Sequence, residues 1–329
     1  MEPVRFGVIS TAKIAREKVI PAMQAGERTA IVGIASRDRA RAEQIAAALG
    51  ITKAYGSYAE MFADPAIEAV YNPLPNHLHV PISIEAAAAG KHVLCEKPVA
   101  LTAEEAGKLI EARDHSGVLI TEAFMVRQHP QWLKVRELIR AGRIGAPRLV
   151  QMSFSYGNRD PANVRNQAEI GGGALYDIGC YPIVLARFVY GAEPDRVLAM
   201  IERDPDFRTD RLTSALLAFP GGAQAAFSVS TQLATYQRTL IFGTEGRIEV
   251  EIPVNAPPDR PTRILVGERD DIETITFEVC NQYTLQGDLF AGLIRDGGRP
   301  EFPLEDAVRN MAVVDALFRS ADSGRSEPV

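Results

Sequence analysis

Three side chains in two separated segments could together move a proton onto or off a hydroxyl group. Lys97 follows a short apolar run, 93–95, that has the pattern of a strand. Asp177 and Tyr181 lie four residues apart in a helical stretch, so both should project from one face of that helix. A lysine cation near a phenol favours the phenolate. These residue types indicate acid–base chemistry at an alcohol or a sugar carbon.

Either Lys97 or Tyr181 is the proton acceptor, and the sequence leaves both possibilities open. The unperturbed pKa of a tyrosine is about 10, so Tyr181 needs a nearby cation to act near neutral pH. Lys97 would instead need burial to lower its pKa. Asp177 could bond a substrate hydroxyl or tune Lys97. We therefore assign the catalytic role to the three jointly, because strongly coupled groups titrate as a unit.

The first third of the chain alternates between short apolar runs and Ala-rich helical stretches. This alternation predicts a parallel sheet with helices on both faces. The expected strands are 4–9, 30–35, 69–71, 93–95 and 118–121, and the expected helices are 14–25, 39–49, 58–63, 79–89 and 103–116. Lys97 would then follow the fourth of these strands.

Strand patterns separated by short turns dominate from about residue 148 onward. The expected strands are 148–155, 197–203, 213–219, 224–231, 239–242, 247–250 and 274–278, and the expected helices are 131–141, 174–188 and 304–321. The sequence therefore predicts an α/β protein of two domains. Residues 1–123 form a Rossmann domain with a doubly wound parallel sheet, and residues 124–329 form an α+β domain with a large, mostly antiparallel open sheet.

Composition and charge narrow the class of protein. The 329 residues are 46% hydrophobic and 24% charged, as in ordinary globular proteins of two domains. A net charge of -6 argues against a nucleic-acid or an anionic membrane partner. The three cysteines have neither metal-ligand nor disulfide spacing, so no metal and a reducing compartment are expected. With no signal peptide and no bilayer-long apolar run, the expectation is a cytoplasmic protein.

The first expected strand runs into a turn and a helix, where a Rossmann fold binds the phosphates of a dinucleotide. The glycine fingerprint is altered, because the G-x-G-x-x-G positions hold Ser10, Ala12 and Ala15. The helix start still offers free amides and a positive dipole end to a phosphate. A strand–turn–helix without a nucleotide is the alternative. The expected phosphate-binding residues are Ser10, Thr11, Ala12, Lys13 and Ile14.

Ser36 and Arg37 follow the second expected strand, where a Rossmann domain reads the ribose of its cofactor. An acidic residue there would bond the ribose hydroxyls of NAD. An arginine instead pairs with a phosphate, and Arg41 one turn later adds charge. The sequence therefore favours NADP over NAD. The alternative is that Arg37 is an ordinary solvated side chain.

Four segments, in order, closely resemble the glucose–fructose oxidoreductase, inositol dehydrogenase and rhizopine-catabolism family. They are Pro-Asn-His-Leu-His at 75–79, Gly-Lys-His-Val-Leu-Cys-Glu-Lys-Pro at 90–98, Glu-Ala-Phe-Met-Val-Arg at 122–127 and Gly-Gly-Gly-Ala-Leu-Tyr-Asp-Ile-Gly-Cys-Tyr at 171–181. The resemblance covers nearly the whole chain and implies an open sheet that forms an oligomer face. Tyr181 stands where many members carry histidine. This resembles the branch of NADP-dependent xylose and glucose dehydrogenases and dimeric trans-dihydrodiol dehydrogenases.

The resemblance also implies roles for further side chains beside the cofactor and the substrate. The expected cofactor contacts are Leu74, Asn76, His79, Glu96, Lys97 and Arg165, of which Arg165 could instead reach the substrate. The expected substrate contacts are Arg127, His129, Asp177, Tyr181 and, on position alone, Tyr283.

These expectations combine into an NADP-dependent dehydrogenase of a sugar or a cyclic polyol. Oxidation of an aldose at its anomeric carbon is the first hypothesis. A trans-dihydrodiol dehydrogenase or a keto-sugar reductase would use the same groups in a differently shaped pocket. A non-catalytic dinucleotide-binding sensor is the alternative of another class. The expected partners are a small-molecule substrate and further copies of the chain, in a homodimer or a homotetramer.

Overall fold

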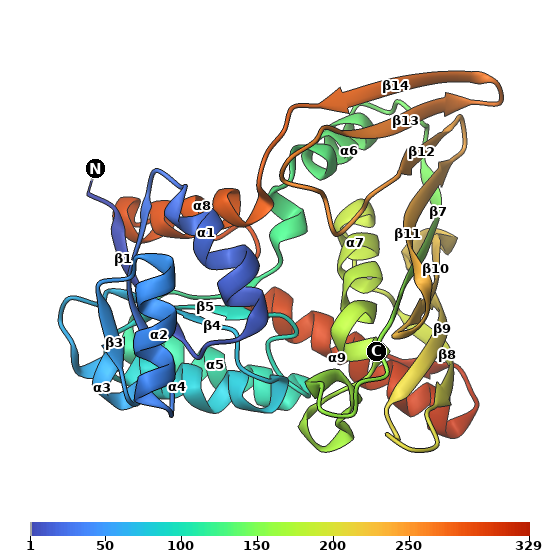
Figure 1. Ribbon diagram of the computed structural model, residues 1–329. Coiled ribbons are helices and arrows are strands. Elements are labelled where there is room, and N and C mark those ends of the chain that lie inside the picture. Colours follow the sequence, from blue (N-terminus) through green and yellow to red (C-terminus); the bar gives the residue numbers. More distant parts are fainter. Residues whose placement is uncertain (1) are drawn as a thin grey trace. The chain divides into compact units, whose positions relative to one another are not determined.

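The computed structural model describes residues 2–329 (Figure 1). The chain forms two compact units. The first comprises the residues up to Met125 together with Asn281–Val308, and the second comprises Val126–Cys280 and Arg309–Val329. Residues 281–308, which the sequence pattern assigned to the second domain, therefore pack with the first.

Six parallel strands form the sheet of the first unit, in the order β3-β2-β1-β4-β5-β6. The strands are β1 (Val4–Ile9), β2 (Thr29–Ala35), β3 (Lys53–Tyr55), β4 (Ala69–Asn72), β5 (His92–Glu96) and β6 (Ile120–Ala123). This is the strand order of a dinucleotide-binding Rossmann fold, so the predicted fold of this unit is confirmed. The edge strand β3 was not predicted, because its residues Lys-Ala-Tyr do not form an apolar run.

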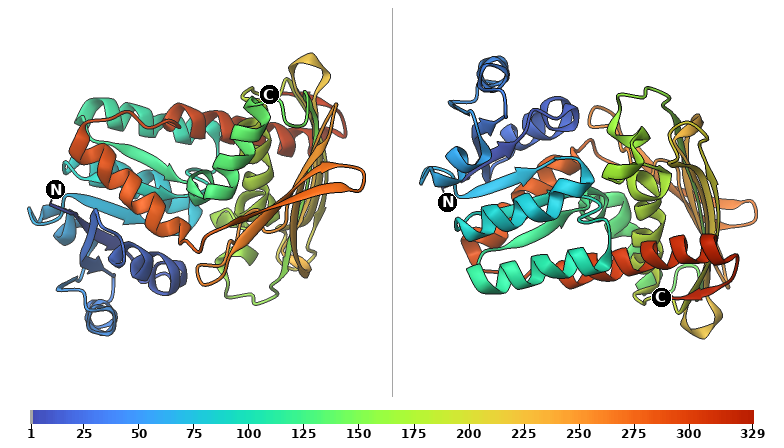
Figure 2. Two further views of the ribbon diagram at one scale, coloured as in Figure 1. Left: turned by 90° about the horizontal axis from the view of Figure 1, so that it is seen from above. Right: turned by 90° about the horizontal axis from the view of Figure 1, so that it is seen from below.

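Helices cover this sheet, and α4 and α5 lie side by side (Figure 2). The helices are the π-helical segment η1 (Ala15–Val19), α1 (Ile20–Gln24), α2 (Arg39–Leu49), α3 (Tyr58–Ala63), α4 (His79–Ala88), α5 (Ala103–Ser116) and α8 (Gln282–Asp296). Helix α8, which the sequence analysis missed, contacts α1. Its Phe290 lies in the core with a ring-centroid distance of 6.0 Å to Phe6 of β1. A segment distant in sequence thus completes the core of the first unit.

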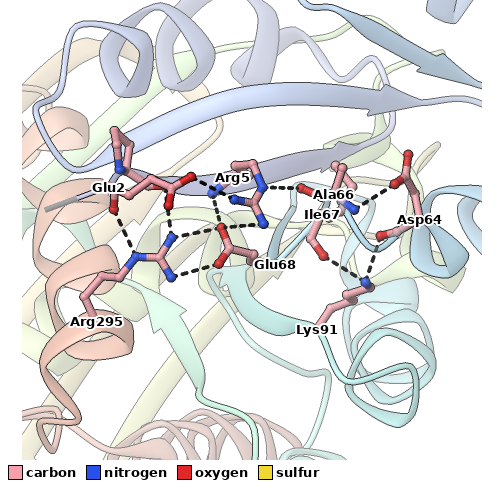
Figure 3. Close-up of polar contacts among 9 residues, drawn as sticks. Glu2, Arg5, Asp64, Ala66, Ile67, Glu68, Lys91 and Arg295 are labelled. Carbon is pink, nitrogen blue, oxygen red and sulfur yellow. Dashed lines mark hydrogen bonds and ion pairs between the residues drawn. The ribbon is translucent and has the colours of Figure 1, made fainter.

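Charged side chains tie α8 to the amino-terminal edge of the sheet (Figure 3). Arg295 donates to both carboxylate oxygens of Glu68, at 2.8 and 2.9 Å. The Arg5 amide donates to the same carboxylate at 3.0 Å. The hydrogen bond from Arg295 is the largest cause that lowers the pKa of Glu68. Because the Arg295–Glu68 pair is bidentate and partly buried, it should stabilise the fold more than an exposed ion pair does.

We expect Glu68→Gln to lower the free energy of unfolding by about 1–2 kcal/mol near neutral pH. The pKa of Glu68 is lowered in the fold, so its stabilisation is present above the unfolded pKa of about 4.3 and is lost as the pH falls through the folded pKa. Urea unfolding of both proteins over this pH range measures the difference. Glu17→Gln, which removes an exposed pair with Lys13, is the control and should change little. A difference that grew as the pH fell would contradict this account.

Lys91 supports the same edge of the sheet, although it lies in the segment that carries the family signature (Figure 3). Its side chain is buried and donates to the backbone oxygens of Asp64 and Ile67, at 2.9 and 2.8 Å. Burial lowers the pKa of Lys91. This lysine therefore holds the turn before β4 in place.

Nine strands form the sheet of the second unit, in the order β14-β13-β12-β11-β7-β10-β9-β8-β15. They are β7 (Pro147–Gly157), β8 (Arg196–Arg203), β9 (Asp210–Ala218), β10 (Gln224–Ser230), β11 (Gln232–Gly243), β12 (Arg247–Val250), β13 (Thr262–Glu268), β14 (Asp271–Phe277) and β15 (Glu327–Pro328). β7 and β10 pair in parallel, and the other neighbouring pairs are antiparallel. The predicted mostly antiparallel sheet is confirmed, with β13 and β15 as additions.

One face of this sheet packs against helices and the other is open. The helices are α6 (Pro130–Arg140), the π-helical segment η6 (Leu175–Gly179) with α7 (Cys180–Tyr190), and α9 (Leu304–Ser323) from Arg309 onward. Alternate residues of β7, such as Val150, Met152 and Phe154, are buried. Large apolar side chains on the other face, including Met200, are exposed.

Candidate active site

Lys97 follows β5 at the carboxyl edge of the parallel sheet, which is where open α/β sheets bind their ligands. Two contacts fix the loop after it. The ring Nδ1 of His79 lies 2.7 Å from the Pro98 oxygen, and the Val99 amide donates to Glu122 Oε1 at 2.8 Å. The backbone that carries Lys97 is therefore held from two neighbouring elements.

His79, an expected cofactor contact, is buried and uses both ring nitrogens within the first unit. They lie 2.7 Å from the backbone oxygens of Pro98 and Leu74. Burial lowers the pKa of His79 to about 4, so near neutral pH the neutral ring donates to one of the two carbonyls. His79 thus joins the Lys97 loop to the loop that holds Leu74 and Asn76. Contacts of these residues with a cofactor remain predictions.

Glu96 lies near two phenols of the first unit, of which Tyr71 is buried and Tyr283 is partly buried. The Tyr71 hydroxyl donates to Glu96 Oε1 at 2.7 Å. Burial, and then the Glu96 carboxylate, raise the pKa of both Tyr71 and Tyr283, so both phenols stay neutral. Tyr283 was expected to contact the substrate together with Arg127 and His129. Tyr283 lies in the first unit on α8, packed against the Rossmann core, and its contact with a substrate remains a prediction.

The turn after β1 keeps a Rossmann backbone without its first glycine. Ser10 has φ of 78°, in the left-handed region that glycine adopts most readily. Its amide donates to Ala35 O at 2.8 Å, and its hydroxyl accepts from the Ala12 amide at 3.3 Å. Ile14 packs against the core, and Lys13 forms an exposed pair with Glu17. The turn therefore takes the left-handed conformation at Ser10 without a glycine.

The two predicted arginines, Arg37 and Arg41, follow the end of β2. The Ser36 hydroxyl accepts from the Asp38 amide at 3.1 Å, and Asp38 caps α2 by accepting from the Arg41 amide at 3.2 Å. The Arg41 guanidinium donates to Gln44 at 2.8 Å, whereas the Arg37 side chain is exposed. Of the two predicted arginines, Arg37 is the better placed for an anionic ligand.

Asp177 in the second unit receives two donors on one oxygen. Its Oδ2 lies 2.8 Å from Arg165 Nε and 2.5 Å from the Tyr156 hydroxyl. Attraction to Asp177 raises the pKa of Arg165, and burial followed by Asp177 raises the pKa of Tyr156. Arg165 is therefore a cation and Tyr156 a neutral donor. A carboxylate held by this pair is suited to accept a hydrogen bond from a hydroxyl, because both donors favour its charged form.

Tyr181 is buried on α7, and its ring centroid lies 6.1 Å from that of Phe154 on β7. The single α-helix predicted over 174–188 is wrong in its first turn, since residues 175–179 form the π-helical segment η6. A Cβ on Gly179 would lie 2.7 Å from the Leu175 side chain, so glycine lets this side chain pack closely. Asp177 and Tyr181 therefore do not keep the i,i+4 relation of a regular α-helix.

His129, an expected substrate contact, has structural partners in the second unit. Its Nδ1 caps α6 by accepting from the Gln131 amide at 3.2 Å, and its Nε2 lies 3.5 Å from Cys280 Sγ. Burial lowers the pKa of His129 to about 4. Arg127, two residues earlier, is also buried. A substrate contact for either residue remains a prediction.

The predicted residues fall into two sets, one in each unit. The first unit holds Ser10, Thr11, Ala12, Lys13, Ile14, Ser36, Arg37, Arg41, Leu74, Asn76, His79, Glu96, Lys97 and Tyr283, and the second holds Arg127, His129, Arg165, Asp177 and Tyr181. The sequence analysis did not identify Glu122, which holds the Lys97 loop, or Tyr156, which donates to Asp177. The periodic pattern of a strand does not show which of its polar side chains will form such contacts. Within residues 2–329, no group of three or more His, Cys, Asp or Glu side chains is placed to hold a metal. No helix of that range is long and apolar enough to cross a membrane.

Two family models match the chain. The model described as oxidoreductase family, NAD-binding Rossmann fold, matches residues 4–124, and the GFO/IDH/MocA C-terminal domain matches residues 132–249. Together they span most of both units.

Curated proteins and solved structures match over nearly the full length. An uncharacterized oxidoreductase of Rhizobium meliloti is 50% identical, with 100% of each chain covered. The D-xylose 1-dehydrogenase (NADP(+)) 2 of Haloferax volcanii is 37% identical over 97% of this chain and 98% of its own. The structure of KijD10, a 3-ketoreductase from Actinomadura kijaniata in complex with NADP and TDP-benzene, matches with a TM-score of 0.92 and 31% identity, over 97% of this chain and 98% of that one.

Proposed function

The chain belongs to the GFO/IDH/MocA oxidoreductase family, and we propose that it transfers a hydride between NADP and a sugar or a cyclic polyol. Oxidation of an aldose at the anomeric carbon is the leading reaction. The similarity to a D-xylose 1-dehydrogenase that uses NADP supports this choice. A cytoplasmic location is part of the proposal, since Cys95, Cys180 and Cys280 are all free thiols.

NADP supplies a nicotinamide ring that accepts or donates the hydride. In the proposal the turn from Ser10 to Ile14 holds the pyrophosphate, and Arg37 binds the 2′-phosphate. Glu96 and Asn76 bind the nicotinamide ribose. The backbone of Ser10 and the exposure of Arg37 support these assignments.

The observation that carries the proposal is the pair of donors on Asp177. An anion held by Arg165 and Tyr156 can accept a hydrogen bond from a substrate hydroxyl and so orient the substrate. Either Tyr181 or Lys97 takes up the proton that leaves with the hydride. The acceptor is a Tyr181 phenolate favoured by the lysine cation, or it is the neutral amine of Lys97. Such proton transfer accelerates a reaction by about 10²–10⁴-fold.

A keto-sugar reductase is the second candidate. Four dTDP-3,4-didehydro-2,6-dideoxy-alpha-D-glucose 3-reductases are 30–31% identical to the chain. The mouse trans-1,2-dihydrobenzene-1,2-diol dehydrogenase is 31% identical over 75% of the chain. In the reductive direction Tyr181 or Lys97 would donate a proton to the carbonyl oxygen. A sensor that binds the dinucleotide without turnover is the remaining alternative.

The absorbance of reduced nicotinamide tests the proposal. The purified protein is incubated with NADP⁺ and a panel of aldoses, cyclic polyols and a trans-dihydrodiol, and separately with NADPH and keto-sugars. We expect reduction of NADP⁺ with at least one aldose, and slower reaction with NAD⁺. Turnover of keto-sugars alone would favour the reductase. Binding of NADP without turnover in either direction would favour the sensor.

The open face of the nine-stranded sheet supports the proposed homo-oligomer. Leu198, Met200, Leu216 and Tyr236 are exposed there and line one shallow depression. Met200 is 77% exposed, which is unusual for a large apolar side chain. A contiguous apolar patch on a sheet face commonly marks an interface between protein copies.

We expect Met200→Glu to dissociate the oligomer, because a buried unpaired charge would replace an apolar contact. Light scattering coupled to size exclusion measures the mass in solution. Leu289→Glu changes a similarly exposed leucine on α8 and should leave the mass unchanged. If the wild type is a monomer, or if Met200→Glu keeps the wild-type mass, this face is not the interface between copies of the chain.

A further inference from the structure

Asp210, the first residue of β9, is a buried carboxylate beside the segment that carries Asp177. It is 1% exposed. Its Oδ2 accepts from the Leu175 amide at 2.6 Å and from the Thr213 hydroxyl at 2.9 Å. Leu175 is the first residue of η6, so Asp210 holds the start of that π-helical segment.

Two glycines let Asp210 and the loop before η6 pack this closely. Gly173 has φ of 118°, and a Cβ there would lie 1.8 Å from Asp210 Oδ1. A Cβ on Gly172 would lie 2.7 Å from the Arg165 oxygen. A side chain at either position would collide with the carboxylate or with the loop. Close approach therefore explains why glycines occupy positions 172 and 173.

Gly173 connects Asp210 to both members of the ion pair that holds the candidate site. Its amide donates to the Arg165 oxygen at 2.9 Å. Its oxygen accepts from the Asp177 amide at 3.2 Å. The backbones of Arg165 and Asp177 are thus fixed to one glycine, which lies directly against Asp210.

From these contacts we infer that Asp210 is a positioning residue for the proposed reaction. It acts through Gly173 and Leu175, which set the backbones of Arg165 and Asp177, and it does not act on the substrate itself. The inference rests on the proposed oxidoreductase function for its kinetic consequence. The structural part of the inference is that Asp210 anchors the backbone of residues 163–181, and this part does not depend on that function.

The surroundings of Asp210 make its hydrogen bond to the Leu175 amide sensitive to pH. Burial raises the pKa of Asp210 to about 6, against the opposing hydrogen bonds from Leu175 and Thr213 and the charge of Arg203 on β8. The charge of Asp210 also affects Tyr156 on β7. The pKa of Tyr156 is raised, first by burial, and Asp210 adds to this shift. Protonation of Asp210 replaces a charge-assisted bond to the Leu175 amide with a weaker neutral one.

The pH dependence of stability and that of activity together distinguish a positioning residue from a residue that only supports the fold. Because the folded pKa of Asp210 is raised, its contribution to stability is present below the unfolded pKa of about 3.9 and is lost as the pH rises through about 6. Activity that depends on ionised Asp210 should instead increase as the pH rises through about 6. A purely structural group would move stability and activity together.

Asp210→Asn tests the inference, since it keeps the shape and removes the charge. We expect kcat to fall about tenfold above pH 7, NADP binding to stay within about twofold, and the melting temperature to be unchanged or raised. The acid limb of kcat near pH 6 should also disappear. Asp204→Asn is the matched control, because Asp204 is a buried carboxylate that accepts from the Asp206 and Phe207 amides at 2.9 Å. That variant should lose stability and keep its kcat.

Hydrogen–deuterium exchange of residues 163–181 gives a readout that needs no turnover. We expect faster exchange in Asp210→Asn than in the wild type above pH 7, and wild-type exchange, corrected for its intrinsic pH dependence, that rises below about pH 6. Unchanged exchange together with a wild-type kcat in Asp210→Asn would overturn the inference. A wild type without turnover but with the expected exchange pattern would overturn the proposed function and leave the anchor in place.

Discussion

Lys97→Met is expected to lower kcat by about 10²–10⁴-fold while NADP binding stays within about twofold. The methionine keeps the length of the side chain and removes the amine that either takes the proton or stabilises a Tyr181 phenolate. The loop after residue 97 should keep its shape, because His79 and Glu122 hold its backbone at Pro98 and Val99.

Steady-state kinetics with the best aldose of the panel, and equilibrium binding of NADP, measure the two parts of this prediction. Lys108→Met, on the exposed surface of α5, is the control and should leave both quantities unchanged. A kcat of Lys97→Met within about threefold of the wild type would remove the amine from the mechanism.

Arg37→Ala is expected to weaken NADP binding by about 10–100-fold and to leave NAD binding nearly unchanged. Hydrogen bonds to a charged group typically contribute about 1.5–3 kcal/mol, which corresponds to this range of affinity. NAD lacks the 2′-phosphate with which the guanidinium would pair. Arg37 is exposed at the end of β2, so its loss should not disturb the fold.

Arg39→Ala provides a matched control for the loss of positive charge near the same strand. Arg39 already pairs with both carboxylate oxygens of Glu60, at 2.6 and 2.7 Å, so its charge is engaged. Titration calorimetry with NADP and with NAD measures all the affinities. Equal weakening of both cofactors in Arg37→Ala, or the larger effect in Arg39→Ala, would show that Arg37 does not read the phosphate.

Much of the fold follows from signals that are local in the sequence. Helices α2 and α5 begin after Asp38 and Thr102, whose side chains cap the first turn, and end before Gly50 and Gly117 in left-handed conformation. These residues stand beside periodic apolar patterns, so the predicted bounds coincide with the observed ones. The parallel arrangement of the strands follows from their alternation with such helices.

The parts that could not be predicted depend on contacts between distant segments. Helix α8 belongs to the first unit because Phe290 reaches the Rossmann core and Arg295 pairs with Glu68, and no pattern within 282–296 records this. For the same reason the packing of Tyr283 against the Rossmann core could not be predicted.

The candidate site shows the same division between local and distant signals. The motif at 171–181 pointed to Asp177, but its partner Tyr156 lies on β7 and its backbone anchor Asp210 on β9. Gly179 of η6 packs beside Leu175 and beside Val229 of β10, which is distant in sequence. Sequence patterns therefore pointed to Asp177 as a candidate, but not to the residues that hold it.

A double-mutant cycle tests most directly the central claim that Lys97 and Tyr181 act on one hydroxyl. The cycle compares kcat of Lys97→Met, Tyr181→Phe and the double variant with that of the wild type, using one aldose and saturating NADP⁺. Groups that act as a unit are strongly non-additive. We therefore predict that the double variant is no more than about threefold slower than the slower single variant. Losses that multiply, so that the free-energy changes add, would show that the two side chains act independently and would contradict the proposed mechanism.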